Sequence, residues 1–267
     1  MSHQPRKRFG QNFLHDPGVI RRIVDSIYPR PDEHLVEIGP GQGALTRPLL
    51  RACGRLDVVE LDRDLIAPLQ QQLADAGELQ VHQADALRFD FCALQAQHGP
   101  RLRVVGNLPY NISTPLLFHL MQQAACIEDM HFMLQKEVVQ RMVAHPGNKD
   151  YGRLTVMLAY YCESEMLFSV GPGAFFPAPN VDSAIIRLRP HRQPPVEVAD
   201  PARLARLVAQ AFSQRRKTLR NNLREWLSAD AIADLDIDPG IRAERLSLAQ
   251  FARLTNALHA LPSDAEV

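Results

Sequence analysis

Val36-Glu37-Ile38-Gly39-Pro40-Gly41-Gln42-Gly43-Ala44 is the stretch that decides the fold. An apolar run ends here, a glycine-rich turn follows, and a helical pattern begins. Glycine lets the backbone turn tightly and approach a ligand closely, and the N-terminus of the following helix favours negative charge. This order is typical of a cofactor-binding loop at the edge of an open α/β sheet.

The rest of the chain continues the alternation of short apolar runs and helical patterns, which predicts a parallel sheet with helices on both faces. The expected strands are 34–38, 56–61, 79–82, 102–106 and 130–134, with a later pair at 166–170 and 184–188 that resembles a hairpin closing the sheet. The expected helices are 43–53, 63–76, 113–124, 136–145 and 152–162. Residues 86–100 lack helix signals and are expected to be mostly loop.

The composition changes at Pro190-His191-Arg192-Gln193-Pro194-Pro195, where the prolines favour extended backbone and indicate a linker. Beyond it, only helical periodicity is found, over 201–213, 215–228 and 247–257. We therefore predict a large α/β domain at 1–190 with a basic N-terminal arm and a linker at 191–200. A small helical domain at 201–267 follows, with a flexible tail after Pro262.

The bulk composition limits the functional classes. The chain has 267 residues, of which 46% are hydrophobic and 22% charged, as in ordinary globular proteins. The basic start is not followed by an apolar run, and no stretch approaches the roughly 18 apolar residues of a membrane helix, so neither a signal peptide nor a membrane span is expected. The 4 cysteines are widely spaced without a C-x-x-C, which predicts no zinc site and free thiols in a reducing cytoplasm.

The glycine loop by itself leaves two cofactors open. Gly39-x-Gly41-x-x-Ala44 satisfies the dinucleotide-binding pattern, and Glu60, at the end of the second strand, suits ribose hydroxyls in a nicotinamide cofactor as well as in S-adenosylmethionine. Two acids favour S-adenosylmethionine. A carboxylate at Glu37 opposes a pyrophosphate but suits the methionine ammonium group, and Asp85 is placed to accept from the adenine amino group. The alternatives are a strand-end acid without a ligand for Glu37 and a helix cap for Asp85.

Asn107-Leu108-Pro109-Tyr110 follows the fourth predicted strand and suits a flat heterocycle with an exocyclic amine. The adenine N6 lone pair is delocalised, and hydrogen bonds from its two N–H groups to the Asn107 side-chain carbonyl and the Leu108 main-chain carbonyl would make it available. Pro109 fixes the corner, and stacking on Tyr110 contributes about 1–3 kcal/mol. With a methyl donor, this predicts adenine-N6 methylation by positioning, without a catalytic histidine. An ordinary strand–turn is the alternative.

Phe175-Phe176-Pro177-Ala178-Pro179-Asn180-Val181-Asp182 is a second aromatic and proline-rich loop, placed before the last predicted strand. Phe176 is a candidate for the second wall of the base slot. The alternative is an apolar anchor that holds the hairpin down.

Basic residues mark candidate RNA contacts, although the net charge is +0, because the local charge distribution sets the field that a partner feels. No acid occurs between residues 201 and 224, and a second cluster lies near the N-terminus at Arg6, Lys7, Arg8, Arg21 and Arg22. A solvated helix face and a disordered tail are the alternatives. The target base must be unstacked, which favours a loop or single strand. The candidate contacts on the predicted helix are Arg215, Arg216, Lys217, Arg220 and Arg224.

Six motifs between residues 10 and 183 together resemble one family, the ribosomal RNA adenine-N6 dimethyltransferases, and most of all its bacterial small-subunit branch. They are Gly10-Gln11-Asn12-Phe13-Leu14, Glu37-Ile38-Gly39-Pro40-Gly41, Glu60-Leu61-Asp62, Asp85-Ala86, Asn107-Leu108-Pro109-Tyr110-Asn111-Ile112-Ser113 and Phe176-Pro177-x-Pro179-x-Val181-Asp182-Ser183.

The resemblance implies a Rossmann-like class I methyltransferase sheet with a helical C-terminal domain that contacts RNA or the ribosome. It implies two adjacent adenosines near the 3′ end of 16S rRNA as target, in an immature 30S particle, and a monomeric cytoplasmic enzyme without a metal. Only the resemblance adds Asn12 and Leu14 to the donor site. The full donor site expected is Asn12, Leu14, Glu37, Gly39, Gly41, Glu60, Asp85 and Asn107.

Three other functions stay open at this point. Relatives that methylate large-subunit rRNA tend to be strongly basic overall, whereas this chain is neutral. A ribosome assembly factor with incidental catalysis and a nicotinamide-dependent oxidoreductase are the others.

Overall fold

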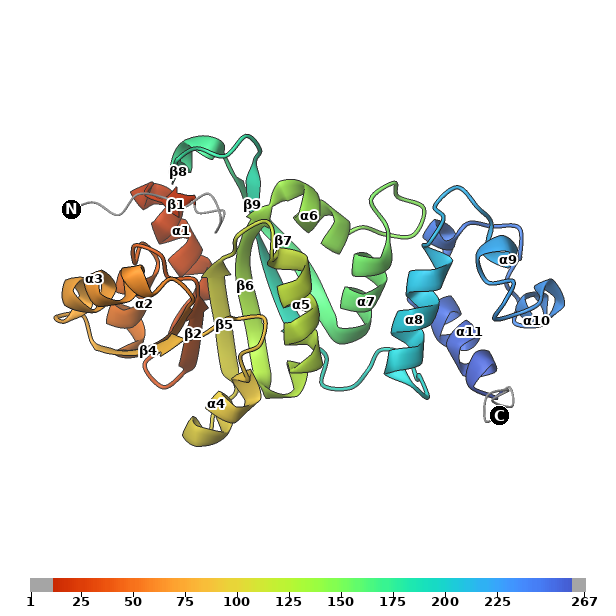
Figure 1. Cartoon of the computed structure of the whole chain (residues 1–267), viewed down its shortest axis with the longest axis horizontal. Helices are drawn as coiled ribbons and strands as arrows, with labels where there is room; N and C mark the ends of the chain where they lie inside the picture. The colour runs from red at the N-terminus through yellow and green to blue at the C-terminus, as the bar shows by residue number, and fades with distance from the viewer. Residues whose placement is uncertain (1–11, 261–267) are drawn as a thin grey trace. The chain divides into compact units, whose positions relative to one another are not determined.

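The computed structural model describes residues 12–260, and the chain forms two compact units (Figure 1). The first unit holds the described residues up to Val139 together with Ser164–Pro190, and the second holds Gln140–Glu163 together with the described residues after Pro190. The chain thus passes from the first unit to the second after Pro190. The segment 140–163, which we placed in the first domain, packs with the second unit instead. Arg6, Lys7, Arg8 and the tail after Pro262 lie outside the described residues.

The first unit is built on a 7-stranded sheet in the order β4-β3-β2-β5-β6-β9-β7. β2 to β6 run parallel, and β9 pairs antiparallel with β6. All the predicted strands are present, several of them longer than expected, and the late pair β7 and β9 are hydrogen-bonded neighbours at one edge. The strands are β2 His34–Ile38, β3 Arg55–Glu60, β4 Glu78–Gln83, β5 Leu102–Asn107, β6 Ile127–Gln135, β7 Cys162–Val170 and β9 Ser183–Pro190.

Helices cover both faces of this sheet. Successive strand residues point to opposite faces, and the consecutive buried residues of β2, β3 and β5 therefore need cover on both sides. Leu35, Val58 and Val105 pack with side chains of α1 to α3 in one buried cluster. On the opposite face, α5 lies in front of β5 and β6 (Figure 1). The helices of this unit are α1 Pro17–Ile27, α2 Thr46–Cys53, α3 Arg63–Leu73, α4 Phe91–His98 and α5 Ser113–Gln122, with α6 Lys136–Met142 crossing into the second unit.

Two local predictions in this unit need correction. α2 begins at Thr46 rather than at residue 43, because Gly41 and Gly43 have positive φ angles of 54° and 81°, outside the right-handed helical region. Residues 86–100 are not mostly loop, since α4 occupies the second half. The Asp90 side chain caps it by accepting from the Ala93 N–H at 2.8 Å. Caps of this kind escape a search based on apolar periodicity.

The expectation of four free thiols is wrong for one pair of cysteines. Cys92 and Cys126 form a disulfide, whereas Cys53 and Cys162 are free and buried. Cys92 lies in α4 and Cys126 ends the 3₁₀ helix η2 Ala124–Cys126, and these two elements contact each other in the fold. Separation along the sequence therefore said nothing about separation in space.

The strand order places the carboxyl ends of β2 and β5 side by side. The chain moves outward from β2 to β3 and β4, and then returns to the other side of β2 as β5. This reversal is the switch point at which open α/β sheets bind ligands. A Cβ atom at Gly106 would lie only 2.6 Å from the Ile38 carbonyl oxygen, so glycine permits the close approach of the two strand ends. The loops after Ile38 and after Gly106 consequently border one crevice.

The second unit is helical, with α8 and α11 packed against each other and against α7. The Tyr151 hydroxyl donates to the Leu246 carbonyl at 2.8 Å within this unit. Across residues 12–260, no helix combines the length and apolarity that crossing a membrane requires. The helices of the second unit are α7 Arg153–Tyr161, α8 Pro201–Ala211, α9 Leu219–Asn222, α10 Ala229–Ala233 and α11 Leu248–Ala260.

The predicted helix over 215–228 is wrong. Only the short α9 forms there, preceded by bends and turns. The Leu219 N–H donates to the Ile241 carbonyl at 2.7 Å, and the Arg220 N–H donates to the Pro239 carbonyl at 3.1 Å. In an α-helix these groups would donate four residues back, so tertiary contacts with the 239–241 segment replace the helix.

Candidate active site

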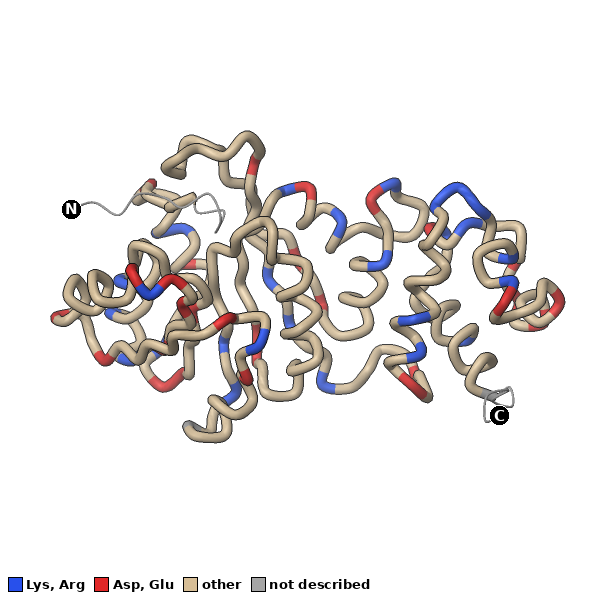
Figure 2. Tube along the Cα trace, viewed as in Figure 1, with Lys and Arg blue, Asp and Glu red and all other residues tan. Residues whose placement is uncertain are grey.

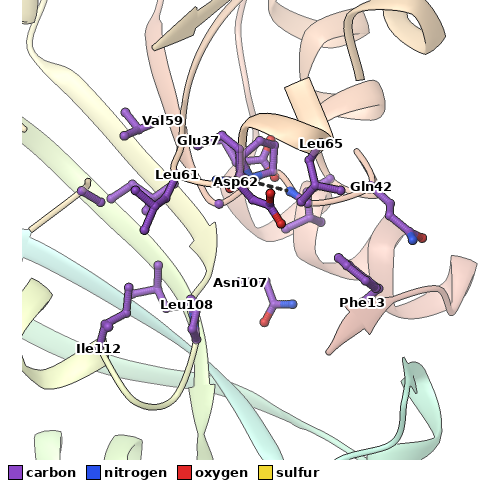
Figure 3. Close-up of a pocket in the computed structure, with 18 of the residues that line it drawn as sticks. Phe13, Glu37, Gln42, Val59, Leu61, Asp62, Leu65, Asn107, Leu108 and Ile112 are labelled. Carbon is purple, nitrogen blue, oxygen red and sulfur yellow. Dashed lines mark hydrogen bonds between the residues drawn. The ribbon is translucent and has the colours of Figure 1, made fainter. Parts of the chain in front are cut away.

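A cavity opens at the switch point, between the loops that follow β2, β3, β4 and β5 (Figure 3). All eight expected donor-site residues line it, and so do four of the five expected acceptor residues. The exception is Phe176, which is not among the lining residues. The predicted residues that line the cavity are Asn12, Leu14, Glu37, Gly39, Gly41, Glu60, Asp85, Asn107, Leu108, Pro109 and Tyr110.

Residues 12–14 contact both the acceptor loop, through Asn107, and the β8 strand that carries Phe176. β1 Phe13–Leu14 pairs antiparallel with β8 Phe175–Phe176, so that Phe13 lies opposite Phe176. The Asn107 amide nitrogen donates to the Asn12 main-chain carbonyl at 3.1 Å. Phe176 is 67% exposed, and this strand pairing places it beside Phe13, which does line the cavity. Phe176 therefore lies opposite a residue of the cavity wall but does not itself line the cavity.

Glu60 ends β3 and is held in place by the backbone. Its Oε1 accepts from the Asp62 N–H at 2.7 Å, and its Oε2 accepts from the Gly41 N–H at 3.4 Å. The Gly41 contact links the glycine loop to the second strand end. Burial raises the pKa of the Glu60 carboxyl, opposed by these backbone hydrogen bonds. The carboxylate is thus fixed at the cavity wall, where acids bind ribose hydroxyls in sheets of this kind.

Glu37 differs from the other two predicted acids because its unpartnered carboxylate oxygen is buried. It is 2% exposed, and its Oε2 makes no hydrogen bond within the described part of the chain. Burial raises its pKa to about 7, with a smaller contribution from the nearby Glu60 charge, although the neighbouring Thr46 hydroxyl acts to lower it. A buried polar atom without a partner is costly, and a cationic group in the cavity would satisfy it. The methionine ammonium group of S-adenosylmethionine has that chemistry.

Asp85 follows β4 and adopts a tight turn rather than a helix cap. Its Oδ1 accepts from the Leu87 N–H at 3.0 Å, and Asp90 caps the following helix instead. The side chain is therefore oriented by its own turn while the residue lines the cavity. This arrangement leaves a carboxylate available to an amino group of a bound ligand.

The acceptor loop 107–112 is fixed at several points. The Leu108 N–H donates to the Met133 carbonyl at 3.1 Å on β6, and the Ile112 N–H donates to the Pro109 carbonyl at 3.2 Å. The Asn107 side chain projects into the cavity, with Leu108 and Ile112 on one side and Phe13 on the other (Figure 3). Because its nitrogen is engaged by Asn12, the Asn107 carbonyl Oδ1 is the atom left to accept from a ligand.

Several cavity residues were missed by the sequence analysis. Leu61 is 53% exposed yet lines the cavity, directly after Glu60. Its position after a strand-end acid was the available signal, because the residues there face the crevice. Phe13 and Asp62 also line the cavity. Asp62 carries a structural role as the N-cap of α3, accepting from the Asp64 N–H at 3.3 Å.

The candidate RNA contacts lie in the second unit and form what we call the basic segment, residues 215–224. In Figure 2 Lys and Arg residues gather on the loop between α8 and α9. All five of its cations are exposed. Arg215 lies 3.6 Å from Glu244 and Arg224 lies 3.4 Å from Glu225, whereas Arg216, Lys217 and Arg220 make no ion pair with any described residue. On α1, Arg21 and Arg22 are also exposed, and Arg22 stacks on Phe168 with 3.9 Å from its guanidinium carbon to the ring centroid.

Comparison with known proteins decides which cofactor and which chemistry the chain uses. The family model for "Ribosomal RNA adenine dimethylase" matches residues 2–260. The chain belongs to that family. It is therefore a methyltransferase that uses S-adenosylmethionine to dimethylate adenine in ribosomal RNA, and the nicotinamide alternative is set aside.

Individual relatives extend the match over nearly the whole chain. The chain is 57% identical to "Ribosomal RNA small subunit methyltransferase A" of Pseudomonas aeruginosa, over 98% of this chain and 97% of the relative. The protein of the same name from Hahella chejuensis is 55% identical over 100% and 97%.

Two solved structures share the fold. A dimethyladenosine transferase from Plasmodium falciparum superposes with a TM-score of 0.76 at 24% identity, covering 91% of this chain and 95% of its own. The 23S rRNA methyltransferase ErmE superposes with a TM-score of 0.70 at 29% identity, covering 93% and 100%. The class I methyltransferase sheet is thereby confirmed. Among residues 12–260 there is no group of three or more side chains suited to hold a metal ion.

Proposed function

We propose that this methyltransferase dimethylates N6 of two adjacent adenosines near the 3′ end of 16S rRNA in an immature 30S particle, as a step in small-subunit biogenesis. The observation that carries the proposal is the 57% identity to a protein named small subunit methyltransferase A. The neutral net charge also separates the chain from the strongly basic enzymes expected to act on large-subunit rRNA. We further propose that it acts as a monomer in the cytoplasm, where such particles are assembled.

On the donor side, we propose a division of roles among the cavity residues. Glu37 pairs with the ammonium group, Glu60 accepts from the ribose hydroxyls, and Asp85 accepts from the adenine amino group. The unpartnered Oε2 of Glu37 supports the first role, and the fixed position of Glu60 at the strand end supports the second. The glycine loop and the 12–14 segment complete the site through Asn12, Leu14, Gly39 and Gly41.

On the acceptor side, we propose that the loop 107–110 activates the adenine amine by positioning. Asn107 Oδ1 and the Leu108 carbonyl accept from the two N–H groups, which concentrates electron density on N6. Pro109 holds the corner, and Tyr110 and Phe176 stack on the base. S-adenosylmethionine supplies a methyl group already activated by its positive sulfur. The methylated amine then loses its proton to water, so the cavity needs no strong base.

We propose that the basic segment binds rRNA phosphates. Arg215, Arg216, Lys217, Arg220 and Arg224 would supply affinity and orientation, while the cavity selects the base. Their exposure, and the lack of ion pairs with described residues at Arg216, Lys217 and Arg220, supports this role. A surface that binds the particle without the cavity would also allow a second role in assembly that does not depend on catalysis.

The deciding experiment is a methylation assay with labelled S-adenosylmethionine on three substrates: unmethylated 30S subunits, mature methylated 30S subunits and protein-free 23S RNA. We expect label only on the unmethylated 30S subunits, mapping to two adjacent adenosines of 16S rRNA as N6,N6-dimethyladenosine. Label on 23S RNA alone would transfer the protein to the large-subunit branch. Label on isolated adenosines of 16S rRNA would remove the claim of an adjacent pair.

A further inference from the structure

Two serines that complete the acceptor motifs have no part in the chemistry described so far. Ser113 is the first residue of α5, after the loop 107–112, and Ser183 is the first residue of β9, after the loop that carries Phe176. Ser113 is 2% exposed and Ser183 is fully buried. Neither is among the residues that line the cavity. Their hydroxyls instead contact another residue of the protein.

Both hydroxyls bind the same residue, Tyr110. The phenol oxygen of Tyr110 lies 2.9 Å from Ser183 Oγ, within hydrogen-bond distance. The Ser113 hydroxyl donates to the Tyr110 main-chain carbonyl at 3.1 Å. One serine thus holds the outer end of the side chain and the other holds its backbone. With both ends fixed, the tilt of the ring between them is restricted.

Ser183 is a rigid anchor because it belongs to the sheet. It pairs with Gln135 across β9 and β6, and the adjacent Lys136 N–H donates to the Asp182 carbonyl at 2.9 Å. The hydrogen bond to Tyr110 therefore joins the acceptor loop to the end of the Phe176 loop, 73 residues away in sequence. Burial raises the pKa of the Tyr110 phenol, and the hydrogen bond with Ser183 opposes that shift. Tyr110 is in this way linked to the end of the loop that carries Phe176, the other ring proposed to stack on the base.

We propose that Ser183, assisted by Ser113, is a positioning residue that holds the Tyr110 ring in the orientation that stacks on the target adenine. This inference rests on the proposed acceptor role of Tyr110. A ring fixed before the base arrives loses no rotamer freedom when the base binds, so more of the stacking free energy is available for capture. It also explains why this position carries tyrosine rather than phenylalanine, since the ring alone would stack equally well.

The test is a double-mutant cycle with Tyr110→Phe and Ser183→Ala, each of which removes one hydroxyl. Single-turnover methylation of unmethylated 30S subunits and titration with S-adenosylhomocysteine are measured for each variant. We expect each single substitution to lower the methylation rate about 5- to 10-fold at subsaturating particle, the size of one missing hydrogen bond. Donor-product affinity should be unchanged, and the double variant should be no slower than the slower single variant, because both remove one bond. Ser164→Ala on β7, whose hydroxyl has no hydrogen-bond partner within residues 12–260, is the matched control and should match the wild type.

Tyr110→Ala separates this inference from the acceptor role on which it rests. A wild-type rate for Tyr110→Ala would remove the acceptor role itself. A large loss for Tyr110→Ala with wild-type rates for Tyr110→Phe and Ser183→Ala would overturn only the positioning role. The positioning role would also be overturned if the rate losses of the two single variants multiplied in the double variant. A variant with a lower melting temperature but a normal methylation rate would overturn it too. If Ser183→Ala fails to fold, Tyr110→Phe alone decides between loss and retention of rate.

Discussion

The cavity of the first unit and the basic segment of the second hold their functional side chains in opposite ways. In the cavity, Glu60, Asp85 and Asn107 are each bound to backbone groups before any ligand arrives. In the basic segment, Arg216, Lys217 and Arg220 are exposed and make no ion pair with described residues. Fixed groups act through geometry, and a small displacement is costly. Exposed cations act through charge, and their contributions are modest, numerous and sensitive to salt. The following substitutions test this contrast.

The largest effect is expected from Asn107→Ala. This substitution removes the side-chain carbonyl that would accept a hydrogen bond from the adenine amine, and whose orientation is fixed by the hydrogen bond from the Asn107 amide nitrogen to Asn12. We expect the rate of methyl transfer to 30S subunits to fall at least on the order of 10²-fold, as for other misplaced reacting groups. The affinity for S-adenosylhomocysteine should change far less, and binding of the particle should persist. Single-turnover rates, calorimetry and particle co-sedimentation measure the three quantities.

Gln71→Ala, which removes an exposed amide of α3 outside both the cavity and the basic segment, is the matched control for that substitution. A near-normal rate for Asn107→Ala would refute the activation of the amine by its carbonyl. Loss of particle binding in parallel with catalysis would contradict the division of labour between cavity and basic segment.

A smaller effect, on donor binding alone, is expected from Glu60→Gln. Charge-assisted hydrogen bonds contribute about 1.5–3 kcal/mol, so affinity for S-adenosylhomocysteine should fall roughly 10- to 100-fold. Affinity for RNA should be unaffected. Glu78→Gln, an exposed acid at the start of β4, is the control. Calorimetric titration measures both variants, and unchanged affinity in Glu60→Gln would count against its ribose role.

Glu37 predicts a pH dependence of donor binding. Its pKa is raised from the ordinary value of 4.5 to about 7, so the donor-free carboxyl is protonated below that pH. Pairing with an ammonium group requires the carboxylate, so affinity should rise with pH, by up to about tenfold per unit below pH 7. The same shift means that the stability contributed by the protonated group, present below pH 4.5, is lost as pH rises through about 7.

Titrations with S-adenosylhomocysteine between about pH 5.5 and 7.5 measure this dependence in the wild type and in Glu37→Gln. The substitution isolates Glu37 from Glu60, whose pKa is also raised. We expect the Gln variant to be nearly independent of pH. An equal slope in both proteins would assign the dependence to another group and deprive Glu37 of its ammonium role.

The contrast between the two regions also explains what the sequence could predict. Strands of an open sheet carry apolar runs, and their carboxyl ends meet at one edge, so Gly39, Glu60, Asp85 and Asn107 could be brought together by spacing alone. Asn12 and Leu14 came only from the family resemblance, because no local pattern shows that an N-terminal strand returns to β8. Leu61 was missed because it was taken as the last residue of the strand 56–61, where a leucine is expected to be buried, whereas β3 ends at Glu60.

Elements outside the sheet were predicted less well, because their structure depends on contacts with segments that are distant in the sequence. The helix expected over 215–228 yielded to the bonds that Leu219 and Arg220 make with the 239–241 segment. The segment 140–163 has a helical pattern that does not state which core it packs against, and α7 packs with α8 and α11. The disulfide between Cys92 and Cys126 likewise depends on α4 lying against η2. Contacts between distant segments decide all three.

The smallest effect is expected from Arg216→Gln combined with Arg220→Gln. Each phosphate that the protein no longer neutralises should reduce the slope of log affinity against log salt by about 0.7–0.9, so a double neutralisation should flatten the slope by roughly 1–2. Near physiological salt, RNA affinity should fall only several-fold. Saturating particle should restore the methylation rate, since the cavity is untouched.

Arg253→Gln, which replaces an exposed arginine of α11, is the control because it removes positive charge elsewhere in the second unit. It should leave the slope unchanged. Equal slopes in all three proteins would make the basic segment an ordinary solvated surface. A rate that stays low at saturating particle would show instead that these cations fix geometry, as the cavity does, and the contrast between the two regions would not hold.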